Sequence, residues 1–374
     1  MARLSLKGLQ SVVTSYVNSQ KISVESFEVT RNNIVGLLDK VGKIMTLDTS
    51  VYDKLPELDG ELLSYGKIVE EWQLDMTLPL DYEVDGDGTK ALANYVPTAR
   101  PVSYSYSLGK KVFPTSIPYN NIERAVHFEA QFVEIVSKIT KKLEDSIASW
   151  KYGLKRQLIG NTIGQIHSNM SGATAYTASS TALAAGTWYK ATIDGSVVVA
   201  VSLVTQTASS ETFAQLLANG KLVEVKMIKN APLPVDEASG ESFIKAVKEV
   251  VEKAKDISEG YSFNGGVLGV EEGLSLYLKQ GIMPSIEVDT LAGAFHREDL
   301  ALGVDAKVVK DFGSDNSSAF AILMDSRAIR LFQGYNGTFS QENGFGARMN
   351  IFRHLEYTGH VSRNAFIVIF EPAA

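Results

Sequence analysis

The sequence predicts an α+β fold organised around one long helix, and three observations support this prediction. Between His127 and Asn161 there is no proline, and apart from one adjacent pair the apolar residues recur at steps of three or four, the helical period. From Trp72 to Val84 apolar and polar residues alternate without a break, which is the period of a strand. The last third of the chain mixes helical and strand patterns and ends in the apolar segment AFIVIF, residues 365–370.

Composition narrows the class of protein. The chain has 374 residues, of which 45% are apolar and 21% charged, as is ordinary for a soluble globular protein of two or three domains. The net charge of −7 argues against a dedicated nucleic-acid binder. The absence of cysteine excludes disulfides and thiolate metal sites. The start of the chain does not resemble a secretory signal, and the longest apolar run is too short to span a bilayer, so no membrane association is expected.

Residues up to about Thr49 show helical spacing in pieces and form a mildly basic arm in an acidic chain. Two interpretations stay open for this arm. Its basic residues belong either to a solvated helix face or to a surface that docks on an acidic partner.

The alternating segment is followed by turn residues and by a second alternating stretch from Val102 to Leu108, so residues 66–120 are predicted to form a long two-stranded ribbon. Pro79 lies within the first strand, and proline is tolerated where a strand has an unpaired edge. The ribbon carries an apolar face that nothing nearby in the sequence covers. It is expected to lie either on its own domain or on another chain.

The long helix is predicted from His127 to Ile159, with one apolar and one charged face. Gly153 makes a bend or a close packing contact possible within it. Lys151 and Lys155 are assigned to its charged face. The residues expected to form its buried face are Phe132, Ile139, Leu143, Ile147, Trp150 and Leu154.

Residues 171–232 are rich in alanine, serine and threonine and poor in charge, and we expect an independent β-rich module inserted there. Asp194 and Gly195 predict a hairpin turn, and residues 209–220 predict a short helix. Beyond it, helices are predicted at 242–257 and 271–281, and strands at 265–270, 304–312 and 318–325. Two final β-rich stretches are expected to be joined near Thr358 and Gly359, with residues 365–370 in the middle of a sheet.

No catalytic constellation is recognisable. The five histidines form no zinc-protease motif, and the segment around Ser262 lacks the second glycine of a nucleophile elbow. The glycines at 265–269 match neither a P-loop nor a dinucleotide motif. A calcium-loop pattern beginning at Asp81 has Leu92 where a glutamate is needed. We therefore predict no catalytic site, no metal and no cofactor.

The order of these parts resembles the major capsid proteins of tailed bacteriophages, the Hong Kong 97 fold. The resemblance implies a basic arm, an extended ribbon called the E-loop, a spine helix, a peripheral (P) domain and an axial (A) domain. The implied ranges are 1–65 for the N-terminal arm, 66–120 for the E-loop, 121–170 for the spine helix and part of the P domain, 171–232 for the inserted β-rich domain, 233–325 for the A domain, and 326–374 for return strands to the P domain.

The resemblance also implies a function. The chain would assemble, as hexamers and pentamers, into the icosahedral head shell that encloses the phage genome, and would reside in the virion after assembly in the host cytoplasm. Its expected partners are a separate scaffolding protein, a portal, and decoration or tail-connector proteins, with packaged DNA enclosed but not specifically bound. The candidate inter-subunit contacts are Trp72, Leu74, Met76, Leu78, Leu80, Tyr82, Tyr104 and Tyr106.

Two alternatives stay open on the sequence alone. An encapsulin-like compartment shell would share the fold, although the inserted segment favours the viral shell. An α/β enzyme with an unrecognised site would instead show a deep pocket with convergent polar groups.

Overall fold

A computed structural model gives the structure of the chain, and its contacts divide it into two compact units. The first unit contains Met1–Lys67, Tyr106–Lys155 and Leu331–Gly359, and the second contains Ile68–Ser105, Arg156–Arg330 and His360–Ala374. The structure describes residues 53–63, 69–74, 99–104, 107–118, 129–193, 197–203, 207–208, 210–212, 215–216, 222–255, 273–286, 302–313, 318–362 and 365–372. Within these ranges no helix is long and apolar enough to cross a membrane.

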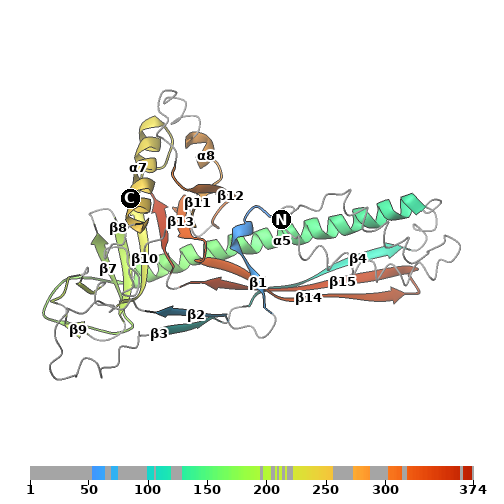
Figure 1. Cartoon of the computed structure of the whole chain (residues 1–374), viewed down its shortest axis with the longest axis horizontal. Coiled ribbons are helices and arrows are strands. Elements are labelled where there is room, and N and C mark those ends of the chain that lie inside the picture. The colour runs from blue at the N-terminus through green and yellow to red at the C-terminus, as the bar shows by residue number, and fades with distance from the viewer. Residues whose placement is uncertain are drawn as a thin grey trace, which may run out of the picture. The chain divides into compact units, whose positions relative to one another are not determined.

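One helix, α5 (Glu129–Gly172), runs through both units and is 44 residues long (Figure 1). It includes the predicted spine from Glu129 onward, since residues 127–128 lie outside the described residues, and it continues well beyond Ile159, where the helix was expected to end. The extension follows from the same spacing, because Ile163, Ile166 and Met170 continue the buried stripe at steps of three and four.

The first unit contains a four-stranded sheet in the order β1-β14-β15-β4. Its strands are β1 (Asp59–Leu62), β4 (Ser107–Pro118), β14 (Ile329–Asn343) and β15 (Arg348–Val361), and a 3-10 turn (Pro56–Leu58) precedes β1. The strand β1 runs parallel to β14, and β15 runs antiparallel to β4. Alternate residues of β15 from Met349 to Tyr357 are buried, so one face of this sheet is covered.

The end of the chain differs from the prediction in one detail. Thr358 and Gly359, expected to join two β-rich stretches, lie inside the continuous strand β15. Both are buried, and Thr358 pairs with Ser107 of β4 after a register shift. Burial and pairing therefore override the turn preference of the two residues. The sequence patterns did not predict β14, which contains glycine and many polar residues.

The second unit contains an eight-stranded sheet in the order β12-β11-β13-β16-β10-β8-β7-β5. The final strand β16 lies between β13 and β10, antiparallel to the first and parallel to the second, so its predicted central position is confirmed. The bounds are β5 (Thr174–Ala175), β7 (Trp188–Ile193), β8 (Val197–Leu203), β10 (Leu222–Asn230), β11 (Leu274–Lys279), β12 (Asp305–Val309), β13 (Ala321–Asp325) and β16 (Ile367–Glu371).

The amphipathic helix α7 (Glu237–Lys255) buries its apolar face in the core of this unit. It begins after Asp236, whose carboxylate accepts a hydrogen bond from the Ser239 amide at 2.8 Å, a typical N-cap. The Phe243 ring lies 5.3 Å from the Phe320 ring and 5.6 Å from the Phe370 ring, centroid to centroid. These contacts join α7 to residues next to β13 and on β16.

The helix predicted at 271–281 is wrong, because the structure has β11 there, followed by the short helix α8 (Ile282–Pro284). Leu274, Leu276 and Leu278 alternate along β11, and Ser275 and Tyr277 between them are also buried. The strand pairs with β12 on one side and β13 on the other. A strand buried on both faces loses the clean period of two, which is why a helical pattern was inferred.

The segment 171–232 is β-rich, and four of its strands, β5, β7, β8 and β10, belong to the eight-stranded sheet. Strands β7 and β8 form the expected hairpin, with Ile193 paired to Val197, and β10 joins this hairpin to β16. Two short strands, β6 (Ala182–Leu183) and β9 (Thr207–Ala208), pair with each other. Most of the short helix predicted at 209–220, and the strand predicted at 265–270, lie outside the described residues.

The ribbon is described at its base. Strands β2 (Val69–Leu74) and β3 (Ala99–Tyr104) form a two-stranded antiparallel sheet of their own. Residues 75–98, which include most of the predicted first strand, lie outside the described residues. The predicted return strand does not remain in the ribbon to its end. Residues 107 and 108 instead begin β4, which pairs with β15 in the four-stranded sheet.

Candidate functional site

The ribbon base contains three of the residues proposed from sequence as inter-subunit contacts. Trp72 and Leu74 lie on β2, and Tyr104 lies on β3. The remaining candidates lie outside the described residues: Met76, Leu78, Leu80, Tyr82 and Tyr106. The register pairs Trp72 with Pro101 and Tyr104 with Val69. Because Val69 and Trp72 are an odd number of positions apart, the positions of Tyr104 and Trp72 belong to opposite faces of the ribbon.

One face of the ribbon base is occupied by its own unit. The Ser362 hydroxyl donates a 2.6 Å hydrogen bond to Glu71 Oε1, and His360 Nε2 lies 3.5 Å from Glu71 Oε2. Glu70, the neighbouring residue on β2, is exposed. Since side chains alternate along a strand, the positions of Trp72 and Leu74 share the face of Glu70 and not that of Glu71.

The central part of α5 packs on the four-stranded sheet of the first unit. Ile147 and Leu154 are buried, and Leu143 and Trp150 pack with them against Leu331, Leu355, Tyr357 and Phe113. The Trp150 ring lies 5.5 Å from the rings of Phe113 and Tyr357 in edge-on arrangements. Two further predicted core residues, Phe132 and Ile139, lie on α5, where the structure does not describe their side chains.

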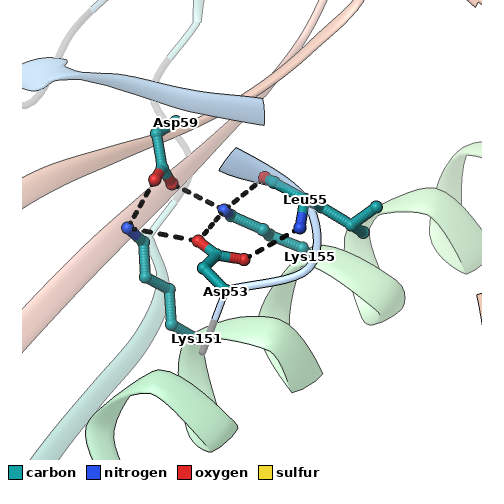
Figure 2. Close-up of polar contacts among 5 residues, drawn as sticks. All are labelled: Asp53, Leu55, Asp59, Lys151 and Lys155. Carbon is teal, nitrogen blue, oxygen red and sulfur yellow. Dashed lines mark hydrogen bonds and ion pairs between the residues drawn. The ribbon is translucent and has the colours of Figure 1, made fainter. Parts of the chain in front are cut away.

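A buried ionic network joins this helix to residues 53–59, which lead into β1 and include its first residue (Figure 2). Lys151 and Lys155, one helical turn apart on α5, face Asp53 and Asp59. Lys155 Nζ donates to Asp53 Oδ2 and, at 2.6 Å, to the Leu55 carbonyl oxygen. It also forms an ion pair with Asp59 Oδ1 at 2.7 Å, although without hydrogen-bond geometry. Lys151 Nζ donates to Asp59 Oδ2 at 2.7 Å.

The network is balanced in charge and largely removed from water. The side chains of Lys155 and Asp53 are fully buried, that of Lys151 is 7% exposed and that of Asp59 is 27% exposed. Burial alone would raise the pKa of the Asp53 carboxyl. The nearby Lys155 charge, hydrogen bonds from Lys155 and the Leu55 amide, and the Lys151 charge outweigh burial, so the pKa of Asp53 is lowered.

The charged face of the helix was expected to meet solvent or a neighbour, and for Lys151 and Lys155 this expectation is wrong, because both are buried within their own unit. The sequence does contain a signal for this burial. Lys151 directly follows Trp150 and Lys155 directly follows Leu154, so both lysines lie at the border of the apolar face. A second buried pair lies near the same sheet, where Arg353 Nη1 is 3.3 Å from Glu144 Oε1. Burial raises the pKa of Glu144 despite the opposing charge of Arg353. Such pairs hold segments together and contain no activated nucleophile.

The described residues contain no group of three histidine, aspartate or glutamate side chains placed to bind a metal ion. The contacts that they do show connect one element to another. Such contacts hold neighbouring elements of one unit in fixed positions.

Comparison with solved structures defines the class of protein. The capsid chain of Staphylococcus phage Andhra matches with a TM-score of 0.50 and 11% identity, covering 86% of this chain and 84% of that chain. The capsid chain of the cyanophage P-SCSP1u has a TM-score of 0.46 and 10% identity, covering 87% of this chain and 90% of that chain. No curated protein matches the sequence. The chain has the Hong Kong 97 fold of phage capsid proteins.

The sequence also identifies a particular family among proteins of this fold. Residues 6–371 match the family of Phi29-like phage major capsid proteins, and the chain belongs to that family. It is a virion component that assembles with copies of itself into a phage head shell. This assignment favours the viral head shell over the encapsulin-like compartment that the sequence had left open.

Proposed function

We propose that the ribbon, which begins with β2 and ends with β3, is the element through which each subunit of the shell contacts its neighbours. The observation that supports this role is that the two faces of the ribbon base have different surroundings. Glu71 faces its own unit, whereas the positions of Trp72 and Leu74 lie on the other face, together with the exposed Glu70. An apolar face turned away from its own unit gains most free energy when another subunit covers it.

Heterologous contacts of this kind, repeated between identical subunits, close into rings and shells. We infer that the subunits form hexamers and pentamers, with contacts along the face that begins at Trp72 and Leu74 and continues through Met76, Leu78, Leu80 and Tyr82. Tyr104 and Tyr106 are proposed contacts as well, with Tyr104 on the other face of the ribbon.

The finer features of the function are also proposals. The protein acts structurally and catalyses no reaction. It assembles in the host cytoplasm with a separate scaffolding protein, a portal and decoration or tail-connector proteins. Its net charge of −7 suits a wall that encloses DNA without binding it tightly, because binding gains affinity from basic side chains that displace counterions.

The test is a double variant, Trp72→Asp with Leu74→Asp. We expect a folded subunit that no longer forms shells, because two charges on the contact face would be desolvated in the assembly. A matched control replaces two exposed apolar residues elsewhere, Leu233→Asp with Val235→Asp, and should assemble normally. Electron microscopy and sedimentation measure assembly, and circular dichroism measures folding. Shells formed by the ribbon variant at the control's yield would rule out this role.

A further inference from the structure

The base of the ribbon is attached to its unit through one carboxylate. Glu71 of β2 accepts the Ser362 hydroxyl hydrogen bond at 2.6 Å, and its other oxygen lies 3.5 Å from His360 Nε2, a charge pair when the imidazole is protonated. The side chain of Glu71 is 23% exposed and that of His360 is 8% exposed, so these contacts are largely shielded from water. Shielding makes such contacts stronger than they would be at the surface.

The groups that face Glu71 are themselves held in place. The Ser362 amide donates to the Ala328 carbonyl oxygen at 2.8 Å, and the Ser362 hydroxyl accepts the Ala365 amide at 2.9 Å. The positive charge of Arg327 also acts on Glu71.

Arg327 is fixed in turn, because its guanidinium donates to both carboxylate oxygens of Asp325, at 3.1 and 2.7 Å. Glu71 therefore meets a preformed site. That site is built from the turn after β13, the end of β15 and the connection that leads to β16.

Strand pairing does not supply this attachment in the described part of the ribbon. There β2 pairs with β3 and with no strand of the eight-stranded sheet. A two-stranded ribbon has little stability of its own, and its direction is set by what holds its base. The contacts of Glu71 lie at that base, two residues into β2.

We propose that Glu71, His360 and Ser362 form a clamp that fixes the direction in which the ribbon leaves its unit. The three are positioning residues for shell assembly, since they act through the ribbon and not by contacting the neighbouring subunit. This inference rests on the proposed role of the ribbon as the inter-subunit contact. When these contacts of Glu71 are lost, the subunit folds normally but presents its contact face at variable angles.

The experiment compares Glu71→Ala, Glu71→Gln and the control Glu252→Ala, which removes an exposed carboxylate on α7, away from the ribbon. Alanine removes the acceptor, whereas the glutamine carbonyl oxygen can still accept from Ser362. Loss of a hydrogen bond to a charged group changes an equilibrium by about tenfold. We expect Glu71→Ala to give about tenfold fewer closed shells with an unchanged melting temperature, and faster hydrogen exchange at β2 and β3 in the unassembled subunit. Glu71→Gln should restore most of the shell yield.

The outcomes separate the clamp from the function of the ribbon. If Trp72→Asp with Leu74→Asp abolishes shells while Glu71→Ala assembles normally, the clamp is refuted and the ribbon's role stands. If Glu71→Ala unfolds the subunit, or if Glu71→Gln is as defective as Glu71→Ala, the positioning role is also refuted. If the ribbon double variant itself assembles, the ribbon's role fails and the clamp inference fails with it.

Discussion

Lys155 is the residue that most clearly departs from its ordinary environment. A lysine is almost never fully buried unless it is paired, and here its ammonium group contacts Asp53, Asp59 and the Leu55 carbonyl oxygen. Forming such a pair in the interior yields little net stability, because both ions lose their hydration. Breaking it costs about 3–5 kcal/mol, because one charge is left without a partner. The network therefore acts mainly by excluding other placements of residues 53–59 against α5.

The lowered pKa of Asp53 predicts acid sensitivity. A carboxyl whose pKa is lower in the folded than in the unfolded chain stabilises the fold above its usual value of 3.8, and this contribution is lost as the pH falls through the lowered value. Asp53→Asn should reduce stability at neutral pH, and its difference from the parent protein should shrink below about pH 4. Chemical denaturation of the unassembled subunit at several pH values measures this. A difference that stays constant down to pH 2 would contradict it.

At the scale of elements, α5 is continuous through a residue that disfavours helix. Gly153 lies within the helix, and a Cβ atom added to it would meet no atom within 4 Å. The close packing contact considered from the sequence is therefore not what this glycine provides, and the bend stays a prediction. Gly109 differs, because a Cβ there would lie 3.2 Å from Trp150 and 3.3 Å from Leu154, so the absence of a side chain allows β4 to approach the helix.

This contrast gives a prediction for α5. Gly153→Ala should raise the free energy of unfolding by about 1 kcal/mol, the difference in helix propensity between the two residues. Gly109→Ala should lower it, since the Trp150 and Leu154 side chains must shift. Thermal and chemical denaturation of the unassembled variants measure both effects. Equal changes in the free energy of unfolding for the two substitutions would mean that the space around each glycine does not determine the effect of an added methyl group.

Periodicity predicted the elements whose two faces differ. Helix α7 and the apolar stripe of α5 could be predicted from the sequence, because water lies on one side of each and the core on the other. The strand β11 was not, since it is buried on both faces and its pattern mimics a helix. The partners of Lys155 and Glu71 could not be predicted either. Each of these contacts joins residues that lie far apart in the sequence, and a single sequence contains no signal for that proximity.

At the scale of the whole molecule, both sheets are assembled from distant parts of the chain. In the first unit, β1 pairs with β14 and β4 with β15. In the second, β16 is the strand that connects β12-β11-β13 with β10-β8-β7-β5. Cooperativity in this unit therefore depends on a strand of five residues. Sequence order predicted the succession of elements but not these pairings, which follow from tertiary packing.

The central place of β16 can be tested by substitution with proline. Val368 is fully paired, opposite Met227 of β10 and Leu323 of β13. Val368→Pro should destabilise the second unit by about 1–3 kcal/mol, because proline cannot donate to the ladder and leaves a buried acceptor without its hydrogen bond. Asp305→Pro, at the first residue of the edge strand β12, is the matched control and should be tolerated. Comparable melting temperatures for the two variants would show that β16 does not connect the halves.

The position of β16 also has a consequence during translation. The strands on either side of it are synthesised earlier, and they remain two separate half-sheets until Ile367–Glu371 has left the ribosome. A chain that is interrupted before this point lacks the strand that joins them. The eight-stranded sheet can therefore be completed only after this strand has been synthesised, and we expect chains that stop before Ile367 to be absent from assembled shells.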